Sequence, residues 1–302
     1  MNCLDLSVNI AGIRLKNPIM NASGCFDPES MCRVQGMDLK RLGAIVTKGT
    51  TLEPRSGNPQ PRICEHQGGM INWIGLENPG IDEVLAAKVP FMARFGVPVI
   101  LNISGFTVEE FANMADQANR IQGVDALEVN ISCPNVHGGK IPFGCDPEIA
   151  AQVTAAVRAK TRMPVIVKLT PNVAEDLIGK IARAVVDTGA DAISLINTIK
   201  VENVGGIAVG GWSGPPIKPV ALRLINQVAK AVSVPIIGMG GISTLQDVFD
   251  FFNVGATAVA VGTANFKNPL VLMELIDQLE NYCLENGLES LERVKEKIKG
   301  GK

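Results

Sequence analysis

Eight short runs rich in valine and isoleucine recur along the sequence, each followed by a polar or glycine-containing tail. The runs cover residues 18–24, 43–50, 98–105, 126–135, 164–172, 191–198, 235–241 and 257–263. Short apolar runs bounded by turn residues are typical of buried strands. Amphipathic segments lie between most of the runs, so we expect parallel strands joined by helices. Eight such units without a change in spacing favour an α/β fold of the closed (β/α)8 or TIM-barrel type over an open doubly wound sheet.

The segment after Pro216 illustrates the helical connections, because its apolar residues recur at the spacing of one helix face. They are Val220, Leu224, Ile225, Val228 and Val232. Near the start, "LDLSVNIAGIRLKN" alternates around an Ala-Gly turn and predicts an N-terminal β-hairpin at the bottom of the barrel. The last 36 residues predict a C-terminal helical extension whose charged tail, "ERVKEKIKGGK", is solvated. No low-complexity linker interrupts the chain, so we predict one domain over residues 1–302.

Charge and hydropathy narrow the function classes. The chain has 28 lysines and arginines against 30 aspartates and glutamates, a formal net charge of -2, which gives no electrostatic case for nucleic acid or a membrane surface as a partner. The N-terminus lacks the basic region of a secretory signal, and no run of about 20 uncharged apolar residues occurs. We therefore expect a cytoplasmic protein that acts on a small molecule.

The cysteines and histidines of the sequence show no metal-binding pattern. The seven cysteines are dispersed without a C-x-x-C pair, so we expect reduced thiols and not ligands of zinc or of an iron-sulfur cluster. The two histidines, His66 and His137, form no metal-binding or Ser-His-Asp pattern, and a structural or surface role is expected for both.

Polar residues gather in the tails of the predicted strands. The active site of a TIM barrel is built from the loops that follow its strands, so these tails are where function is expected. The residues are Asn21, Ser23, Lys48, Asn102, Asn130, Cys133, Lys168, Asn197, Thr198, Gly240, Gly241, Gly262 and Thr263. One asparagine there is explained by a turn, whereas a whole set indicates a binding site.

The residue types in these tails suggest what is bound. Glycines after the last two strands let backbone N–H groups approach a phosphate, so we expect a phosphorylated ligand or cofactor. Lys48 and Lys168 are suited to a carboxylate or an anionic ring. The carboxamides of Asn72, Asn102, Asn130 and Asn197 supply the donors and acceptors that a planar heterocycle requires.

Cys133 is the candidate for proton transfer. A free thiol has a pKa of about 8.5, and nearby lysines would lower it toward neutral pH. The structural alternative is a buried, unreactive thiol.

Six motifs, in order, resemble the family 1 dihydroorotate dehydrogenases: "NISCPN", "VKLTPN", "ISLINT", "GGWSGPPIKP", "PIIGMGG" and "VAVGTANF". The cysteine of "NISCPN", together with "GTANF" and "TLEPRSGNPQPR", is most similar to class 1B, the NAD-linked form. The resemblance implies an FMN-binding TIM barrel, a cytoplasmic flavoprotein and oxidoreductase of pyrimidine (UMP) biosynthesis that oxidises dihydroorotate to orotate.

The resemblance also implies roles for single residues. Cys133 would take the C5 proton of dihydroorotate while a hydride passes from C6 to N5 of FMN, and Lys168 would stabilise negative charge on the reduced flavin. The substrate-binding positions implied are Lys48, Asn72, Trp73, Ile74, Gly75, Leu76, Asn130, Asn197 and Thr198. The FMN-binding positions implied are Ser23, Lys48, Gly49, Asn102, Asn130, Lys168, Ile196, Gly214, Gly240, Gly241, Gly262 and Thr263.

For partners, the resemblance implies a homodimer, joined in a heterotetramer by a separate electron-transfer subunit that carries FAD and an iron-sulfur cluster and passes electrons to NAD. This sequence departs from the class 1B pattern at two places. The connection over residues 199–210 is short, and Trp73 stands where the family generally has a small residue. Both departures bear on the substrate.

Three other functions are compatible with the residues. A dihydropyrimidine dehydrogenase-like enzyme would share the barrel, FMN and the cysteine, but its uracil-type substrate lacks a carboxylate for Lys48. An aldolase would use Lys168 to form a Schiff base and would be colourless. A barrel that binds a phosphate ligand without catalysis would be unaffected by replacement of Cys133.

Overall fold

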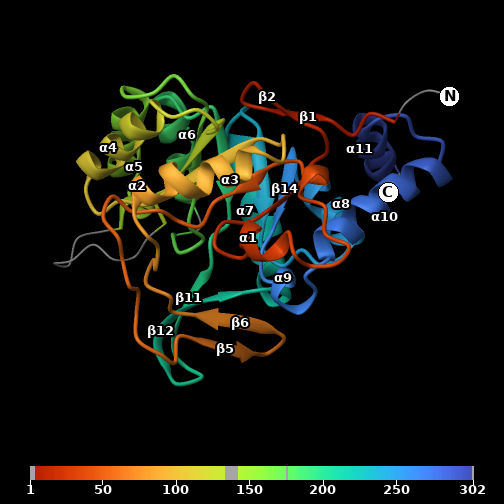
Figure 1. Cartoon of the computed structure of the whole chain (residues 1–302). Helices are drawn as coiled ribbons and strands as arrows, with labels where there is room; N and C mark the ends of the chain where they lie inside the picture. The colour runs from red at the N-terminus through yellow and green to blue at the C-terminus, as the bar shows by residue number, and fades with distance from the viewer. Residues whose placement is uncertain (1–3, 133–141, 175, 301–302) are drawn as a thin grey trace.

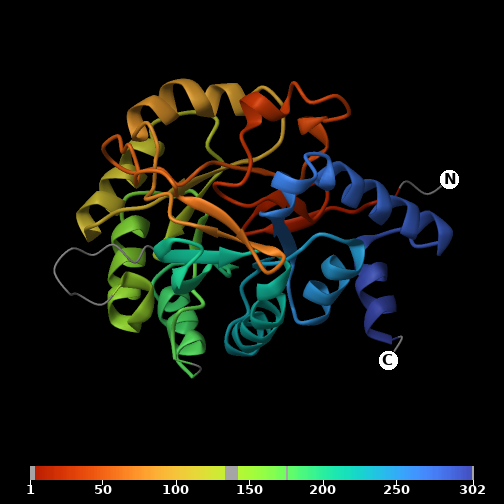
Figure 2. The same cartoon turned by 90° about the horizontal axis from the view of Figure 1, so that it is seen from below.

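A computed structural model describes residues 4–132, 142–174 and 176–300 and places eight parallel strands in one sheet (Figures 1 and 2). Their order in the sheet is β3-β14-β13-β10-β9-β8-β7-β4. The strands are β3 Ile19–Asn21, β4 Ile45–Val46, β7 Val99–Ile103, β8 Ala126–Asn130, β9 Val165–Lys168, β10 Ala192–Leu195, β13 Ile236–Met239 and β14 Ala258–Val261. Each of the eight predicted runs contains one of these strands, and the predicted TIM-barrel fold is confirmed.

The two outer strands of this order, β3 and β4, meet through a side chain. The Asn21 carboxamide donates from Nδ2 to Val46 O at 2.8 Å and accepts at Oδ1 from Val46 N at 3.0 Å. A primary amide carries the same donor and acceptor as a peptide group, so Asn21 replaces a rung of the backbone ladder. Gly43 N also donates to Ile19 O at 2.8 Å, and a Cβ at Gly43 would stand 2.3 Å from Asn17 O. These contacts close the barrel.

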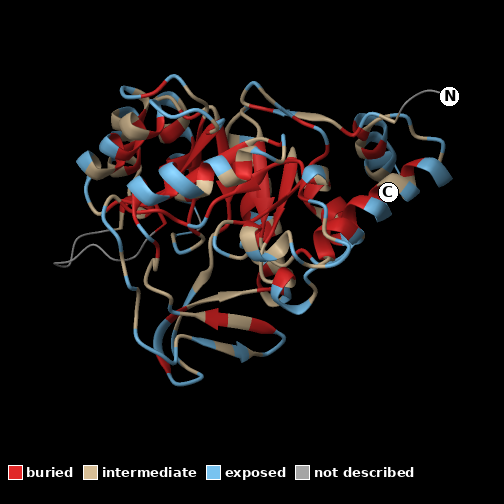
Figure 3. Ribbon diagram, viewed as in Figure 1, coloured by how far each residue is buried: buried red, intermediate tan, exposed pale blue. Residues whose placement is uncertain are grey.

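Helices cover the outside of the barrel, and their exposed faces point away from it (Figures 1 and 3). The helices are α1 Pro28–Met31, α2 Ile81–Glu83, α3 Val89–Ala93, α4 Val108–Ala118, α5 Pro147–Arg158, α6 Ile178–Asp187, α7 Lys218–Ala231, α8 Leu245–Asn253, α9 Ala264–Lys267, α10 Val271–Glu285 and α11 Leu291–Gly300. Short 3-10 turns lie at Leu39–Arg41, Phe143–Cys145 and Pro215–Ile217, and a π-helical turn at Val84–Lys88 joins α2 to α3.

Helix α7 confirms the helix that the spacing of apolar residues after Pro216 predicts. Its buried residues include Leu224, Ile225 and Val228, as the spacing predicts. Val220 is only partly buried, and Val232 lies beyond the helix end in an extended conformation.

The barrel interior is sealed at one end by the predicted hairpin. Strands β1 Val8–Ile10 and β2 Ile13–Leu15 pair antiparallel, and their Ile10 and Leu15 side chains are buried. They pack with Ile100, Ala126 and Ile166 in one apolar cluster. These residues stand near the starts of their strands, so the hairpin closes the N-terminal end of the barrel.

The C-terminal helical extension is present as α10 and α11. Its charged tail was expected to be solvated, but Val294 of α11 is fully buried. Helix α11 carries an apolar stripe as well as its charges, and the stripe packs inward. The segment at Asp5 contacts the connection between α10 and α11, since Asp5 N donates to Glu289 O and Leu291 N to Asp5 O. Among the helices in the described ranges, none is long and apolar enough to cross a membrane.

A second, antiparallel sheet lies beyond the other end of the barrel (Figure 1). Its order is β11-β12-β6-β5, with β5 Ile63–His66, β6 Gly69–Asn72, β11 Ile199–Val204 and β12 Ile207–Ser213. The sequence suggested only a short connection over 199–210, whereas the structure has a hairpin whose turn glycines, Gly205 and Gly206, both have positive φ. Such turns match the twist of paired strands.

Candidate functional site

A cavity of about 600 Å³ opens at the carboxyl ends of the barrel strands, between the barrel and the second sheet. Strand tails form one wall, and the β5–β6 turn with the end of β12 forms the other. Ten predicted site residues line it: Ser23, Lys168, Ile196, Asn197, Thr198, Gly214, Gly240, Gly241, Gly262 and Thr263. The structure therefore brings together residues from five strand tails.

Glycines in this wall are required by conformation as well as by space. Gly240 and Gly241 have φ of 121° and 84°, and Gly214 has φ of 92°, values that L side chains rarely adopt. A Cβ on Gly241 would stand 2.8 Å from Lys218 Cβ and 2.9 Å from Gly214 O. The wall beside β13 is thus bare backbone, which suits close approach of a phosphate.

A hydrogen-bonded loop supports these glycines from behind. Asp247, at the start of α8, accepts from the backbone N of Ser243 and of Thr244, both at 2.8 Å. Lys218 pairs with Asp247 and, at 2.6 Å, with Asp250. Burial acts to raise the pKa of Asp247, but hydrogen bonds from Lys218, Ser243 and Thr244 outweigh it and lower that pKa below 3.8.

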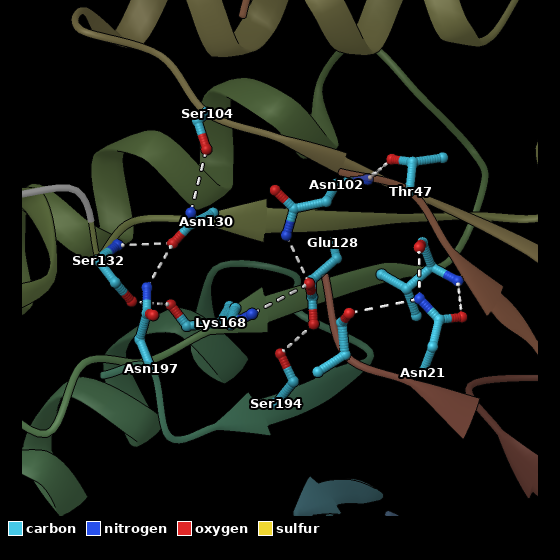
Figure 4. Close-up of polar contacts among 12 residues, drawn as sticks. Asn21, Thr47, Asn102, Ser104, Glu128, Asn130, Ser132, Lys168, Ser194 and Asn197 are labelled. Atoms are coloured by element: carbon cyan, nitrogen blue, oxygen red, sulfur yellow. Dashed lines mark hydrogen bonds and ion pairs between the residues drawn. The ribbon is translucent and has the colours of Figure 1, made fainter. Parts of the chain in front are cut away.

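A buried carboxylate, Glu128, lies inside the barrel beside Lys168, which lines the cavity (Figure 4). Its Oε2 accepts from Asn102 Nδ2 at 2.5 Å and stands 3.7 Å from Lys168 Nζ, while its Oε1 accepts from Ser194 Oγ at 2.6 Å. Only 3% of Glu128 and 5% of Lys168 are exposed. Sequence reasoning missed Glu128, although a charged residue within the apolar run "ALEVN" was the signal for it.

Strand geometry explains why these four groups meet. Alternate residues of a strand face the same side. Ile100, Ala126, Ile166 and Ala192 fill the barrel interior, so the residues two positions later also point inward. These are Asn102, Glu128, Lys168 and Ser194, on the adjacent strands β7, β8, β9 and β10.

Only the donor group of the Asn102 carboxamide has a hydrogen-bond partner among the described residues. Its Nδ2 donates to Glu128, but its Oδ1 is buried without a hydrogen-bond partner among the described residues. Gly49 packs against this oxygen, since a Cβ there would lie 3.2 Å away. A buried unpaired acceptor is costly, so it suits a ligand that brings an N–H donor.

Asn130 and Asn197, two of the predicted site residues, are neighbours (Figure 4). Asn197 Nδ2 donates to Asn130 Oδ1 at 3.5 Å, and Asn130 Nδ2 donates to Ser104 Oγ at 3.1 Å. Thr198 N donates to Asn197 Oδ1 at 2.8 Å. Ser132 is held beside them, because its N donates to Asn130 Oδ1 and its Oγ to Lys168 O.

Lys48 follows β4 and does not line the cavity. Its half-exposed side chain places Nζ 3.4 Å from Glu77 Oε2, which also accepts from Arg62 Nη2 at 2.8 Å. The hydrogen bond from Arg62 and the charge of Lys48 lower the pKa of Glu77.

The predicted substrate segment from Asn72 to Leu76 does not line the cavity. Asn72 ends β6 and donates from Nδ2 to Gly211 O at 3.2 Å, and the Trp73 indole is 40% exposed. Ile74 O accepts from Asn58 N. Gly75 and Leu76 both have positive φ, and Leu76 Cδ2 reaches within 3.5 Å of a Cβ placed on Gly49.

Two thiols bear on the chemistry. Cys133, the predicted base, lies outside the described residues, as does His137. Cys25, which was not among the predicted site residues, lines the cavity beside Gly262. Burial raises the pKa of the Cys25 thiol to about 11, although the charge of Lys168 acts in the opposite direction, so Cys25 stays protonated at neutral pH. Within the described ranges, no three His, Cys, Asp or Glu side chains are grouped to hold a metal ion.

Comparison of the sequence with known proteins points to one family, and comparison of the structure shows a known fold. The family model "Dihydroorotate dehydrogenase" matches residues 5–283. The catalytic subunit of dihydroorotate dehydrogenase B (NAD(+)) from Geotalea uraniireducens is 48% identical over 298 residues, covering 96% of this chain and 97% of that protein. The protein of the same name from Geobacillus kaustophilus is 49% identical and covers 91% of this chain and 89% of its own. A solved structure from Eimeria tenella, DHODH in complex with ferulenol, superposes with a TM-score of 0.80 at 23% identity, covering 94% of this chain and 86% of that chain, and shows the same fold.

Proposed function

The chain belongs to the dihydroorotate dehydrogenase family, an oxidoreductase family, and on that premise we propose that it oxidises dihydroorotate to orotate with FMN, as a step of UMP biosynthesis. The observation that carries the proposal is the cavity in which Lys168 and Asn197 share walls with the positive-φ glycines Gly240 and Gly241. An anionic, phosphorylated heterocycle fits such a wall.

The residues present fit FMN. Backbone at Gly240, Gly241, Gly262 and Thr263 would hold the phosphate, where side chains are absent or small. Lys168 would face the ring as its cation, and the unpaired Asn102 Oδ1 would accept a ring N–H. When bound, FMN supplies a hydride acceptor.

Cys133 is proposed as the base that removes the C5 proton. A thiolate is a stronger base toward a carbon acid than a carboxylate of pKa about 4. Support comes from Ser132, the preceding residue, which hydrogen bonds to Asn130 and to the backbone of Lys168. Cys25, a thiol that lines the cavity, is a poor alternative because burial raises its pKa to about 11.

Substrate recognition is proposed for the amides and for Lys48. Asn130 and Asn197 present neighbouring carboxamides that match the alternating N–H and C=O groups of the substrate ring. Lys48 would pair with the substrate carboxylate, and the segment from Asn72 to Leu76 would cover it. This is supported by Leu76, whose Cδ2 lies within 3.5 Å of a Cβ placed on Gly49, the residue after Lys48.

A partner subunit is also proposed. The relatives' names describe catalytic subunits of an NAD(+)-linked enzyme, which supports a separate subunit that relays electrons to NAD. We propose that FAD and an iron-sulfur cluster reside on that subunit, in a heterotetramer of two copies of each chain. The cytoplasmic location stays a prediction.

The test is to purify the protein, identify the released flavin, and measure orotate formed from dihydroorotate with an artificial electron acceptor. The proposal expects about one FMN per chain and orotate formation, with little oxidation of dihydrouracil. A colourless protein would overturn it. A yellow protein that turns over dihydrouracil and not dihydroorotate would keep the cofactor and reject the substrate.

A further inference from the structure

We propose that Glu128 is a positioning residue that holds the Lys168 ammonium in place and offsets its charge, and thereby sets the reduction potential of the bound flavin. This inference rests on the proposed function, in which Lys168 faces FMN. Glu128 itself lies inside the barrel and does not line the cavity. Its effect on the flavin is therefore exerted from behind Lys168.

The contacts of Glu128 hold its carboxylate beside the Lys168 ammonium. Asn102 and Ser194 each donate to one of its oxygens, at 2.5 and 2.6 Å, and Lys168 stands 3.7 Å from Oε2. Four adjacent strands thus meet at one carboxylate that is 3% exposed. A buried carboxylate requires donors and an opposite charge, and here both come from neighbouring strands.

The electrostatic consequence follows from the burial. Charges within a protein interior interact far more strongly than charges in water. Lys168 alone would favour the reduced flavin, which carries negative charge, whereas Glu128 opposes that preference. The pair therefore presents less net charge to the ring than a lone lysine would.

The sharpest variant is Glu128→Gln, because glutamine preserves the shape and the hydrogen bonds. Its amide oxygen in place of Oε2 accepts from Asn102, and its amide nitrogen in place of Oε1 donates to the Ser194 hydroxyl, which can accept. Only the charge beside Lys168 is removed. Ser194→Ala is the matched control, since it removes one hydrogen bond to Glu128 and keeps both charges.

The measurement is the midpoint potential of the FMN holoenzyme, obtained by anaerobic titration against a reference dye. We expect Glu128→Gln to shift the potential to a more positive value. Equivalently, the ratio of the dissociation constants of oxidised and reduced FMN rises by on the order of tenfold. Ser194→Ala should stay close to the wild-type potential, and Glu128→Asp, which keeps the charge but withdraws it from Lys168, should shift the potential in the same direction as Glu128→Gln by a smaller amount.

The outcomes separate this inference from the proposed function. A potential in Glu128→Gln equal to that of the wild type would overturn the inference, as would an equal shift in Ser194→Ala. A wild-type protein that binds no FMN would overturn the proposed function and the inference together. If Glu128→Gln does not fold, Glu128→Asp is measured in its place. Its shorter side chain withdraws the carboxylate from Lys168, so an unshifted potential would contradict the positioning role.

Discussion

The side chain of Asn21 joins β3 to β4 by pairing with both backbone polar groups of Val46, at 2.8 and 3.0 Å. Asn21 is fully buried, and it stands where the first and last strands of the sheet order meet. The carboxamide and the hydrogen bond from Gly43 N to Ile19 O form this seam, so the loss of the carboxamide should weaken it. The first prediction tests this seam.

We predict that Asn21→Leu lowers the free energy of unfolding by about 2–4 kcal/mol. Leucine is similar in volume but leaves the N–H and C=O of Val46 buried without partners. Urea unfolding measures the change, with Asn9→Ala as control, since the Asn9 carboxamide accepts only from Gly12 N in an exposed turn. Equal losses in the two variants would contradict a role for Asn21 in closing the barrel.

Gly241→Ala is predicted to weaken FMN binding at least about tenfold, because its Cβ would collide with Lys218 and with Gly214 O at a φ of 84°. Isothermal titration of the apoprotein with FMN measures the affinity. Gly179→Ala on helix α6 is the matched control, since its Cβ would make an ordinary 3.5 Å contact with Ala231. Unchanged affinity in Gly241→Ala would show that the phosphate lies elsewhere.

The Asp247 carboxylate gives a pH-dependent prediction. Its folded pKa lies below its ordinary value, so its stabilisation is fully present above pH 3.8 and is lost as the pH falls through the folded pKa. Asp247→Asn should cost about 2–3 kcal/mol at pH 7, and the difference from wild type should shrink in acid below about pH 4. Urea unfolding across pH 3–7 checks this. A difference that is independent of pH would contradict the assignment.

The control for Asp247→Asn is Asp176→Asn, which breaks the exposed ion pair between Asp176 and Lys180, two residues four positions apart in the sequence. Exposed pairs contribute little, so Asp176→Asn should leave the free energy of unfolding close to that of the wild type at neutral pH. A loss of stability as large as that of Asp247→Asn would mean that burial does not determine how much these ion pairs stabilise the fold.

Glu77 is predicted to compete with the substrate for Lys48, because Glu77 Oε2 stands 3.4 Å from Lys48 Nζ. Glu77→Gln should lower the KM for dihydroorotate by roughly twofold to fivefold, since an exposed ion pair is only weakly stabilising and competes little with a bound carboxylate. Glu202→Gln, which breaks the exposed pair with Lys200 on β11, is the control and should not change KM. An unchanged or increased KM in Glu77→Gln would argue against Lys48 as the carboxylate partner.

Much of the fold could be predicted from sequence because its signals are local. The eight apolar runs, the hairpin around Ala11 and the face of α7 each follow from a short-range pattern. The second sheet could not be predicted in this way. Its strands β5 and β11 are only partly buried, and β6 pairs with β12 across a large separation in sequence, so no single segment shows a buried strand pattern.

Most of the residues predicted for the site stand at the ends of strands, whereas Glu128, within a strand, was not predicted. Lys168, Asn197 and the glycines after β13 come at strand ends, and the cavity is found there. Glu128 lies in the middle of β8, and its partners come from three other strands. Only the assembled barrel shows that those strands turn the same face inward.

The most direct test of the central claim is anaerobic stopped-flow mixing of the FMN holoenzyme with dihydroorotate, followed at the visible flavin band. We predict rapid bleaching in the wild type and a loss of at least about 10²-fold in rate in Cys133→Ala, because the proton at C5 then has no positioned base. Bleaching at the wild-type rate in Cys133→Ala, or no bleaching in the wild type, would contradict the account.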